Sequence, residues 1–283
     1  MNKKNVIPRK LWILWYQGLS EAPLIVKKCI ASWINRNPGW DVTILDNTNL
    51  NKYITLDLPE EKIAGLTLAH QSDLVRLALL IEYGGVWADA TTFCIYPLDD
   101  WIDDYGHSGF FVFSKPGQDR MISNWFIAAE KGNLVVSKLY KLLTCFWIDN
   151  NFKNPNKLKR KIIKILSKRF NRSEETTKYW FSPVVTKILK VYPYCVFHYM
   201  FERLVATDSK AKIIWDTTYK VSADGPHLIR HLGLFSPITD EIEKRIDSSP
   251  APFFKLVWNY DHNPENSVLS YLMKRYPGEL ETG

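Results

Sequence analysis

The sequence lacks any long apolar segment. No run of about 18 apolar residues, the length that a transmembrane helix needs, occurs among its 283 residues. Residues 1–9 are mainly polar and the apolar run after them is short, so this end does not resemble a secretory signal peptide. We therefore expect a protein without a membrane span, either soluble or lying on a surface.

Cysteine is also scarce. The four cysteines, Cys29, Cys94, Cys145 and Cys195, are widely spaced, with no C-x-x-C pair and no cluster with histidine. This spacing favours reduced thiols in a cytoplasmic protein over a disulfide framework or a zinc site. Internal repeats and low-complexity linkers are absent as well, which predicts one domain over residues 1–283.

The composition that remains is typical of a globular protein large enough for one α/β core, with 46% hydrophobic and 24% charged residues. The net charge of +7 favours an anionic partner, and a nucleic acid, an acidic membrane and a nucleotide-sugar all qualify. The 11 Trp and 14 Tyr residues suit the stacking of sugars or bases, or simply an aromatic-rich core.

Residues 72–83 form the most informative segment. Their apolar residues cover most of a helix's circumference, and one narrow polar stripe holds Ser72, Asp73, Arg76 and Tyr83. Because a helix this apolar is buried, Asp73 and Arg76 must be paired or must face a cleft. Their spacing of three residues leaves both a structural ion pair and a functional site open.

A turn and a short strand follow this helix. Gly84 and Gly85 supply a helix stop and a tight turn, and residues 86–88 have the composition of a buried strand that leads to Asp89. Ligands bind α/β sheets at the C-terminal ends of the strands. Asp89 is therefore a candidate site residue.

Elsewhere the hydrophobic periodicity predicts alternating strands and helices. A β-α-β start is expected, with the first, central strand at 11–18, a helix at 23–35 and a second strand at 40–45. Residues 195–203 are ambiguous between strand and helix. The other expected elements are strands at 91–96 and 109–113 and helices at 134–147, 156–172, 186–194, 238–246 and 267–274.

The segment 156–172, NKLKRKIIKILSKRFNR, contains eight Lys or Arg residues and no acid. Its apolar residues recur every four positions, which predicts a basic amphipathic helix. Such a helix binds an acidic membrane surface with about 1 kcal/mol per basic residue. Packing on the core with a solvated basic back is the competing role. Nucleic-acid binding is disfavoured, because Phe170 is the sole aromatic residue of the segment.

Several separated blocks resemble one group of enzymes. Residues 72–91 contain S-D-x-x-R, an apolar helix and then E-Y-G-G-V-W-x-D-A-T. This order resembles sugar-nucleotide-dependent glycosyltransferases, namely glycosyltransferase family 32 and, more closely, the bacterial capsular polysaccharide synthesis proteins. Further similar blocks lie at residues 7–18, 32–46, 121–129, 225–227 and 255–258.

The resemblance implies a GT-A-like α/β fold, that is, a Rossmann-type mixed sheet flanked by helices, with a helical C-terminal part. Residues 1–130 would bind the nucleotide-sugar, residues 131–250 would face the acceptor and the membrane, and residues 251–283 would close the site. It also implies a retaining transferase of the hexosyltransferase type, with a UDP-sugar as the expected donor. Front-side displacement, with the leaving phosphate as base, is the mechanism we expect.

The matched positions imply roles for particular residues. Asp73 and Arg76 would hydrogen-bond sugar hydroxyls, and the fork of the guanidinium would orient the donor. Trp15 and Gln17, at the end of the first strand, would lie beside the uracil or other base. Asn124 would face the donor sugar. Core packing for Trp15 and a turn or helix N-cap for Asn124 are the alternatives.

In transferases of this fold a C-terminal loop commonly closes over the diphosphate and can add a metal ligand. The block at 255–258 implies that Lys255 and Trp258 contact the diphosphate. His262 is a further candidate, both for the diphosphate and for a metal.

The resemblance also implies a divalent metal, Mn²⁺ or Mg²⁺, that two carboxylates hold against the diphosphate. The motif here is Asp89-Ala90-Thr91, so the second acid is replaced by threonine. Asp89, Thr91 and His262 are the candidate ligands, and one of the acids at 99–104 could complete the shell. Cationic stabilisation by Lys or Arg could instead replace much of the metal's role.

The expected partners are a nucleotide-sugar donor and an oligosaccharide or lipid-linked glycan acceptor, with no nucleic acid. The protein would lie in the cytoplasm, on the inner face of the cell membrane, through residues 156–172. The expected process is bacterial capsule or surface polysaccharide synthesis. A non-catalytic glycan- or nucleotide-sugar-binding relative that has lost the second acid is the alternative.

Overall fold

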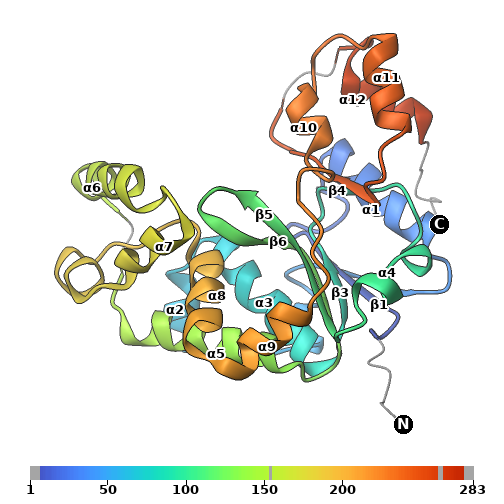
Figure 1. Ribbon diagram of the computed structural model, residues 1–283. Helices are drawn as coiled ribbons and strands as arrows, with labels where there is room; N and C mark the ends of the chain where they lie inside the picture. The colour runs from blue at the N-terminus through green and yellow to red at the C-terminus, as the bar shows by residue number, and fades with distance from the viewer. Residues whose placement is uncertain (1–6, 153–154, 261–263, 277–283) are drawn as a thin grey trace.

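A mixed five-stranded sheet forms the centre of the computed structural model, which describes residues 7–152, 155–260 and 264–276 (Figure 1). The strand order is β2-β1-β3-β6-β5, with β1 parallel to β2 and β3, and β6 antiparallel to β3 and β5. This confirms the predicted α/β architecture. The strands are β1 (Lys10–Leu14), β2 (Asp41–Leu45), β3 (Gly85–Ala88), β5 (Phe110–Gly117) and β6 (Arg120–Ala129).

The middle strand is β3, not β1, so the prediction of a central first strand was wrong. The reason is the hairpin of β5 and β6, which adds two antiparallel strands on the far side of β3. Residues 121–129, which the sequence did not identify as a strand, form most of β6. Strand β6 is buried along most of its length, so the alternation that marks a half-exposed strand is missing.

Glycines fix how β3 enters the sheet. Gly84 and Gly85 have φ of +68° and +96°, values that side chains rarely allow. A Cβ on Gly85 would lie 2.4 Å from the main-chain oxygen of Lys10 in β1. Trp12 of β1 donates from its indole nitrogen to the oxygen of Gly84 across 3.0 Å. The turn therefore lets β3 lie close against β1 and sets where Asp89 leaves the sheet.

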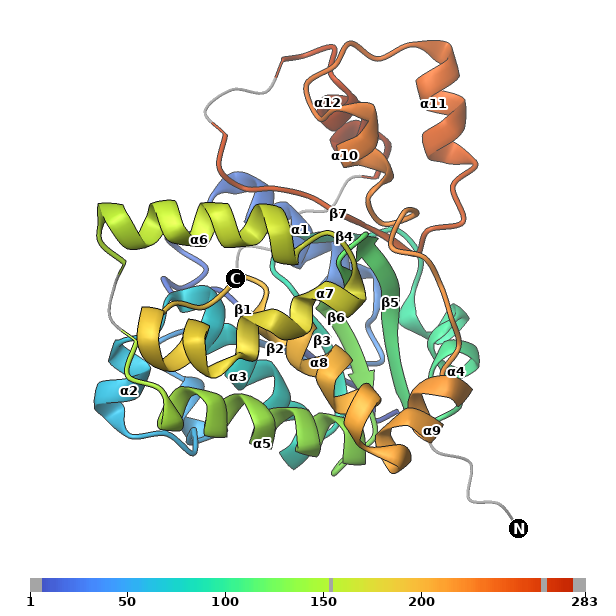
Figure 2. The same ribbon diagram turned by 60° about the vertical axis from the view of Figure 1, so that its left-hand side comes forward.

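Helices cover both faces of the sheet, as Figure 2 shows. One face, with Trp12 and Trp87, packs against α3 (Leu68–Glu82), α5 (Leu134–Asp149), α8 (Val196–Thr207) and α9 (Ser209–Thr217). The predicted helices at 72–83 and 134–147 are thus confirmed, and the ambiguous residues 195–203 are helical. The opposite face packs against α1 (Leu24–Arg36), which confirms the helix predicted at 23–35.

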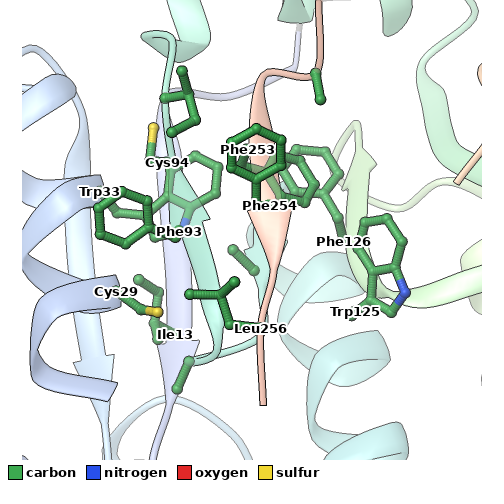
Figure 3. Close-up of a cluster of buried hydrophobic side chains, with 14 of the residues drawn as sticks. Ile13, Cys29, Trp33, Phe93, Cys94, Trp125, Phe126, Phe253, Phe254 and Leu256 are labelled. Atoms are coloured by element: carbon green, nitrogen blue, oxygen red, sulfur yellow. The ribbon is translucent and has the colours of Figure 1, made fainter. Parts of the chain in front are cut away.

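A second, two-stranded sheet joins distant parts of the chain. It consists of β4 (Thr92–Cys94) and β7 (Phe253–Lys255), antiparallel to each other. Phe253 stacks on Phe126 of the main sheet, with ring centroids 5.0 Å apart, inside the aromatic cluster of Figure 3. Trp33 donates to the main-chain oxygen of Thr92 across 2.9 Å. This pairing places the segment that follows β7 beside the end of β3.

The last part of the chain forms a small helical lobe at the top of Figure 1. It contains α10 (Leu228–Leu232), α11 (Asp240–Asp247) and α12 (Val268–Arg275), so the helices predicted at 238–246 and 267–274 are confirmed. The remaining elements are η1 (Leu50–Lys52), α2 (Glu60–Ala64), η2 (Leu98–Asp100), α4 (Ile102–Tyr105), α6 (Lys157–Phe170), α7 (Glu174–Thr177), η3 (Lys178–Phe181) and η4 (Val184–Leu189).

The basic segment forms the helix α6, as predicted. Ile162, Ile163, Leu166 and Phe170 pack against a small core around Trp180, so much of the apolar face is used within the protein. The helix predicted at 186–194 was wrong. A π-helical turn, η4, precedes Lys190, whose φ of +52° ends it. None of the described helices is long and apolar enough to cross a membrane.

Candidate functional site

A cavity of about 530 Å³ opens where β1 and β3 end. Its walls come from the segments after β1, β3 and β7, the start of α3, the β5–β6 hairpin, and the starts of α8 and α10. All the predicted site residues that fall within the described chain line this cavity: Trp15, Gln17, Asp73, Arg76, Asp89, Thr91, Asn124, Lys255 and Trp258. Their roles stay predictions, and the predicted His262 lies outside the described residues.

Asp73 and Arg76 form a buried ion pair on the first turns of α3. Arg76 Nη1 lies 2.5 Å from Asp73 Oδ1, and the side chains are 4% and 9% exposed for Arg76 and Asp73. Asn124 of β6 donates to the same carboxylate oxygen across 2.9 Å, and Arg76 donates to Ser72 across 2.9 Å. Burial raises the pKa of Asp73, while Arg76 opposes that rise. Asp73 and Arg76 are therefore paired with each other and also face the cavity, and their functional role stays a prediction.

Asp89 leaves β3 beside this pair. Its Oδ1 accepts a hydrogen bond from the indole of Trp87 across 3.0 Å and lies 3.5 Å from Arg76 Nη2. The carboxylate is 28% exposed, so it is available to a ligand while it stays oriented. The Arg76 guanidinium lies over the rings of Trp87 and Phe197, 5.2 and 5.6 Å from their centroids. Its Nε has no hydrogen-bond partner among the described residues.

Aromatic side chains line another part of the cavity. Trp15 meets Trp258 edge to face, with centroids 5.5 Å apart, and Trp258 is 49% exposed. The indole nitrogen of Trp15 and the hydroxyl of Tyr16 are buried and have no described partner. Burial raises the pKa of Tyr16, so its hydroxyl stays a hydrogen-bond donor. Gln17 is exposed at the rim. Trp15 thus packs against the hydrophobic core and also lines the cavity.

Thr91 and Lys255 meet between β4 and β7. The Lys255 ammonium donates to the Thr91 hydroxyl across 2.5 Å and to the main-chain oxygen of Leu256 across 3.1 Å. Burial lowers the pKa of Lys255, and Asp89 opposes that decrease. Sequence analysis assigned both residues to the site but did not foresee their contact.

Arg120, His198, His227 and Arg230 are among the cavity residues that the sequence analysis missed. Burial lowers the pKa of His198 to about 3, with Arg120 adding to the effect. The pKa of His227 is lowered to about 4 by burial, then by Arg230, His231, Lys255 and Arg120. Both imidazoles are therefore neutral at pH 7. The G-P-H turn at 225–227 pointed toward His227 and Arg230, whereas no local signal marked Arg120 or His198.

The described donors do not fit the implied metal site. No group of three or more His, Cys, Asp or Glu side chains converges among the residues that the structure describes. Asp73 is held by Arg76 and Asn124, and the Thr91 hydroxyl is held by a cation. The acids at 99–104 do not line the cavity, and Asp99 instead accepts from Trp40 across 3.0 Å. Of the predicted ligands within the described chain, Asp89 alone offers a carboxylate to the cavity.

Comparison with known proteins gives the family. The sequence pattern described as "Capsular polysaccharide synthesis protein" matches residues 1–179, more than half of the chain. The chain belongs to the capsular polysaccharide synthesis protein family. Most of the cavity walls, from Leu14 to Trp125, lie within the matched range, whereas the Lys255 segment lies beyond it.

Individual relatives are glycosyltransferases by name. The chain is 32% identical over 159 residues to the O-glycosyltransferase braB of Annulohypoxylon truncatum, covering 49% of this chain and 38% of that protein. It is 28% identical over 159 residues to the glycosyltransferase afumC of Aspergillus fumigatus, covering 49% and 40%. The chain thus spans less than half the length of these relatives. Among solved structures, the PaToxG glycosyltransferase is similar with a TM-score of 0.43 and 16% identity, over 85% of this chain and 84% of that one.

Proposed function

We propose that this chain is a retaining glycosyltransferase that moves a sugar from a nucleoside-diphosphate donor, a UDP-sugar, to a glycan or lipid-linked glycan acceptor. One observation carries the proposal. The paired Asp73 and Arg76, Asn124 and the strand-end carboxylate Asp89 share one cavity with four tryptophans and several cations. Family membership and the names of the relatives support the same reaction class.

The cavity offers a different surface to each part of such a donor. The tryptophans Trp15 and Trp258 suit the flat nucleobase, since every base offers a π-face for stacking. Arg76 and Asn124 carry fixed N–H groups that suit sugar hydroxyls, and Asp89 offers an acceptor. Lysine and arginine side chains supply positive charge for the diphosphate.

We propose front-side displacement as the chemical step. The bond between the anomeric carbon and the diphosphate oxygen breaks, and its electron pair stays on the diphosphate. The acceptor hydroxyl oxygen bonds to the same face of that carbon and passes its proton to the departing diphosphate. The chain's part is to orient the donor through Arg76 and Asn124 and to stabilise the negative charge that develops. The process that we propose is bacterial capsule or surface polysaccharide synthesis.

The most informative experiment is incubation of the protein with a panel of nucleotide-sugars, with and without Mn²⁺. Hydrolysis or transfer of one donor is expected, and Asp89→Ala should abolish turnover. Donor binding without turnover in any condition would support the alternative, a non-catalytic binding relative. That alternative gains support from Thr91, whose hydroxyl is held by Lys255. The absence of both binding and turnover with every donor of the panel would contradict the proposal.

We further propose that α6 holds the protein on the inner face of the cell membrane, where a lipid-linked acceptor would be found. Eight Lys or Arg residues lie in residues 156–172, and most of them are exposed. Leu158 and Ile165, seven residues apart and so on the same side of the helix, are 65% and 58% exposed. Exposed apolar side chains beside basic ones favour an anionic lipid surface.

Vesicle sedimentation tests this placement. Binding to vesicles with anionic lipid, and none to neutral vesicles, is expected. The double variant Lys161→Gln/Lys164→Gln should weaken binding several-fold, whereas Lys52→Gln/Lys131→Gln, with the same net charge, should not. Equal weakening of vesicle binding in both variants would show that binding depends on net charge alone and not on α6. Tighter binding to RNA than to vesicles would favour a nucleic-acid partner.

A further inference from the structure

Lys255 contacts a side chain that the sequence analysis assigned to a metal ion. Thr91 was a predicted metal ligand, and its hydroxyl instead accepts a hydrogen bond from the Lys255 ammonium across 2.5 Å. Strand pairing fixes this contact, because Thr92 pairs with Lys255 in the β4–β7 register. The nitrogen of Leu256 also donates to the oxygen of Thr91 across 2.8 Å. The main-chain pairing thus places the two residues side by side, and the ammonium is held by the Thr91 hydroxyl and the main-chain oxygen of Leu256.

The charges around this ammonium favour an anion over a second cation. Among the described residues, the cavity is lined by the side chains of Arg76, Arg120, Arg230 and Lys255 and by two carboxylates, Asp73 and Asp89, which gives a balance of +2 when every group is charged. Arg76 and Asp73 neutralise each other at 2.5 Å. Within the described chain, a divalent ion beside Asp89 would therefore meet that one remaining carboxylate and the repulsion of Lys255, whereas a diphosphate would meet complementary charge.

We propose that Lys255, fixed on Thr91, supplies the positive charge that a divalent metal would otherwise supply to the diphosphate, so that donor binding and transfer need no metal ion. This inference rests on the proposed transferase function. When the bond to the anomeric carbon breaks, the electron pair on the diphosphate oxygen is stabilised by the ammonium of Lys255. The proton of the acceptor hydroxyl passes to the diphosphate, so Lys255 gives up no proton and acts by charge alone.

The test measures the affinity of the full chain for nucleoside diphosphates by calorimetry. The probes are UDP, GDP, ADP and dTDP, each in EDTA and each with Mn²⁺ in excess over the nucleotide. The wild type is expected to bind one of them with a Kd that changes less than threefold between the two conditions. A larger gain in affinity with Mn²⁺ would overturn the inference.

Three variants separate charge from folding. Lys255→Met keeps the length of the side chain without its charge and should lose at least tenfold in affinity in EDTA, while Lys255→Arg should keep most of it. Thr91→Asp/Lys255→Met creates a second carboxylate beside Asp89 and should become Mn²⁺-dependent, with tighter binding in Mn²⁺ than in EDTA. The thermal unfolding of each variant reports whether it folds.

The outcomes distinguish the two proposals. Binding by Lys255→Met that equals the wild type in EDTA would overturn the role of Lys255 and leave the transferase proposal intact. If Lys255→Met does not fold, the comparison of Lys255→Arg and wild type in EDTA and Mn²⁺ still decides, because metal-independent binding is required of both. A wild type that binds no nucleoside diphosphate in either condition would contradict the proposed function itself, and this inference with it.

Discussion

Asn124 donates from its side-chain amide to Oδ1 of Asp73 across 2.9 Å and so joins strand β6 to helix α3 inside the cavity. The same oxygen accepts from Arg76 across 2.5 Å. One carboxylate therefore positions two N–H-bearing side chains from two different elements. A change at Asn124 should affect ligand geometry before it affects the fold.

Asn124→Ala tests this positioning. Loss of a hydrogen bond to a charged group costs about 1.5–3 kcal/mol, or roughly 10–100-fold in kcat/KM for the donor that the panel identifies. Ser123→Ala is the matched control on the same strand, since the Ser123 hydroxyl is buried and has no described partner. Equal kcat/KM in the two variants would show that Asn124 does not position the site.

Arg76→Met tests the cost of breaking the buried pair. Removal of one partner leaves Asp73 charged and buried, so the free energy of unfolding should fall by about 3–5 kcal/mol. The surface pair of Lys131 and Glu82, 3.4 Å apart with side chains 64% and 58% exposed, gives the comparison. Lys131→Met should cost less than about 1 kcal/mol. Urea unfolding measures both, and similar losses in the two variants would speak against the buried-pair interpretation.

Two buried histidines give stability a dependence on pH. The pKa values of His198 and His227 are lowered to about 3 and about 4 in the folded protein, below the usual 6.5. The unfolded chain therefore binds protons first as the pH falls, so their stabilising contribution is complete above about pH 6.5 and is lost as the pH falls toward 4.

His198→Phe removes one of these groups. The stability of the variant relative to wild type should improve as the pH falls from 7 to 5, which thermal unfolding across that range measures. A difference in Tm that stays constant over the range would show that His198 does not titrate on unfolding.

Trp258→Ala tests the aromatic part of the cavity. Stacking of a base on an aromatic ring contributes about 1–3 kcal/mol, so the Kd for the bound nucleoside diphosphate should rise by roughly 5–150-fold. The unfolding midpoint should change little, because Trp258 is 49% exposed. Tyr179→Ala, at 50% exposure and away from the cavity, is the control and should leave the Kd unchanged. An unchanged Kd in both variants would exclude Trp258 from base binding.

Gly85→Ala tests the entry of β3. A φ of +96° combined with a Cβ position 2.4 Å from the Lys10 oxygen means that β1 and β3 must separate. Backbone strain alone costs about 1–3 kcal/mol, and the lost strand contact adds to it. Gly39→Ala, where a Cβ meets nothing within 4 Å, should be close to wild type in Tm. A stable Gly85→Ala protein would contradict this account of the turn.

Local patterns were sufficient for much of this fold. The helices α1, α3, α5, α6, α11 and α12 followed from spacing, since each buries or covers one continuous stripe. The polar stripe of residues 72–83 also indicated that Asp73 and Arg76 would be paired or face a cleft, and they do both.

The pairing between distant segments could not be predicted from local sequence patterns. The β4–β7 sheet joins residues about 160 positions apart, and nothing near Thr91 indicates that Lys255 will hold its hydroxyl. Arg120 was missed for the same reason, because its place in the cavity depends on the antiparallel return of β6, which has no alternation to mark it. The resemblance indicated which residues belong together, whereas their mutual contacts depended on the packed structure.

The pairing of β4 with β7 has a consequence for how the protein is made. A chain emerging from the ribosome has already exposed β1, α1, α3 and β3 when Asp89 appears, but the wall that carries Lys255 and Trp258 is still to be synthesised. Strand β4 has no partner strand until some 160 further residues have been synthesised. Nascent chains are therefore expected to lack a complete ligand site until β7 has been synthesised and joins β4.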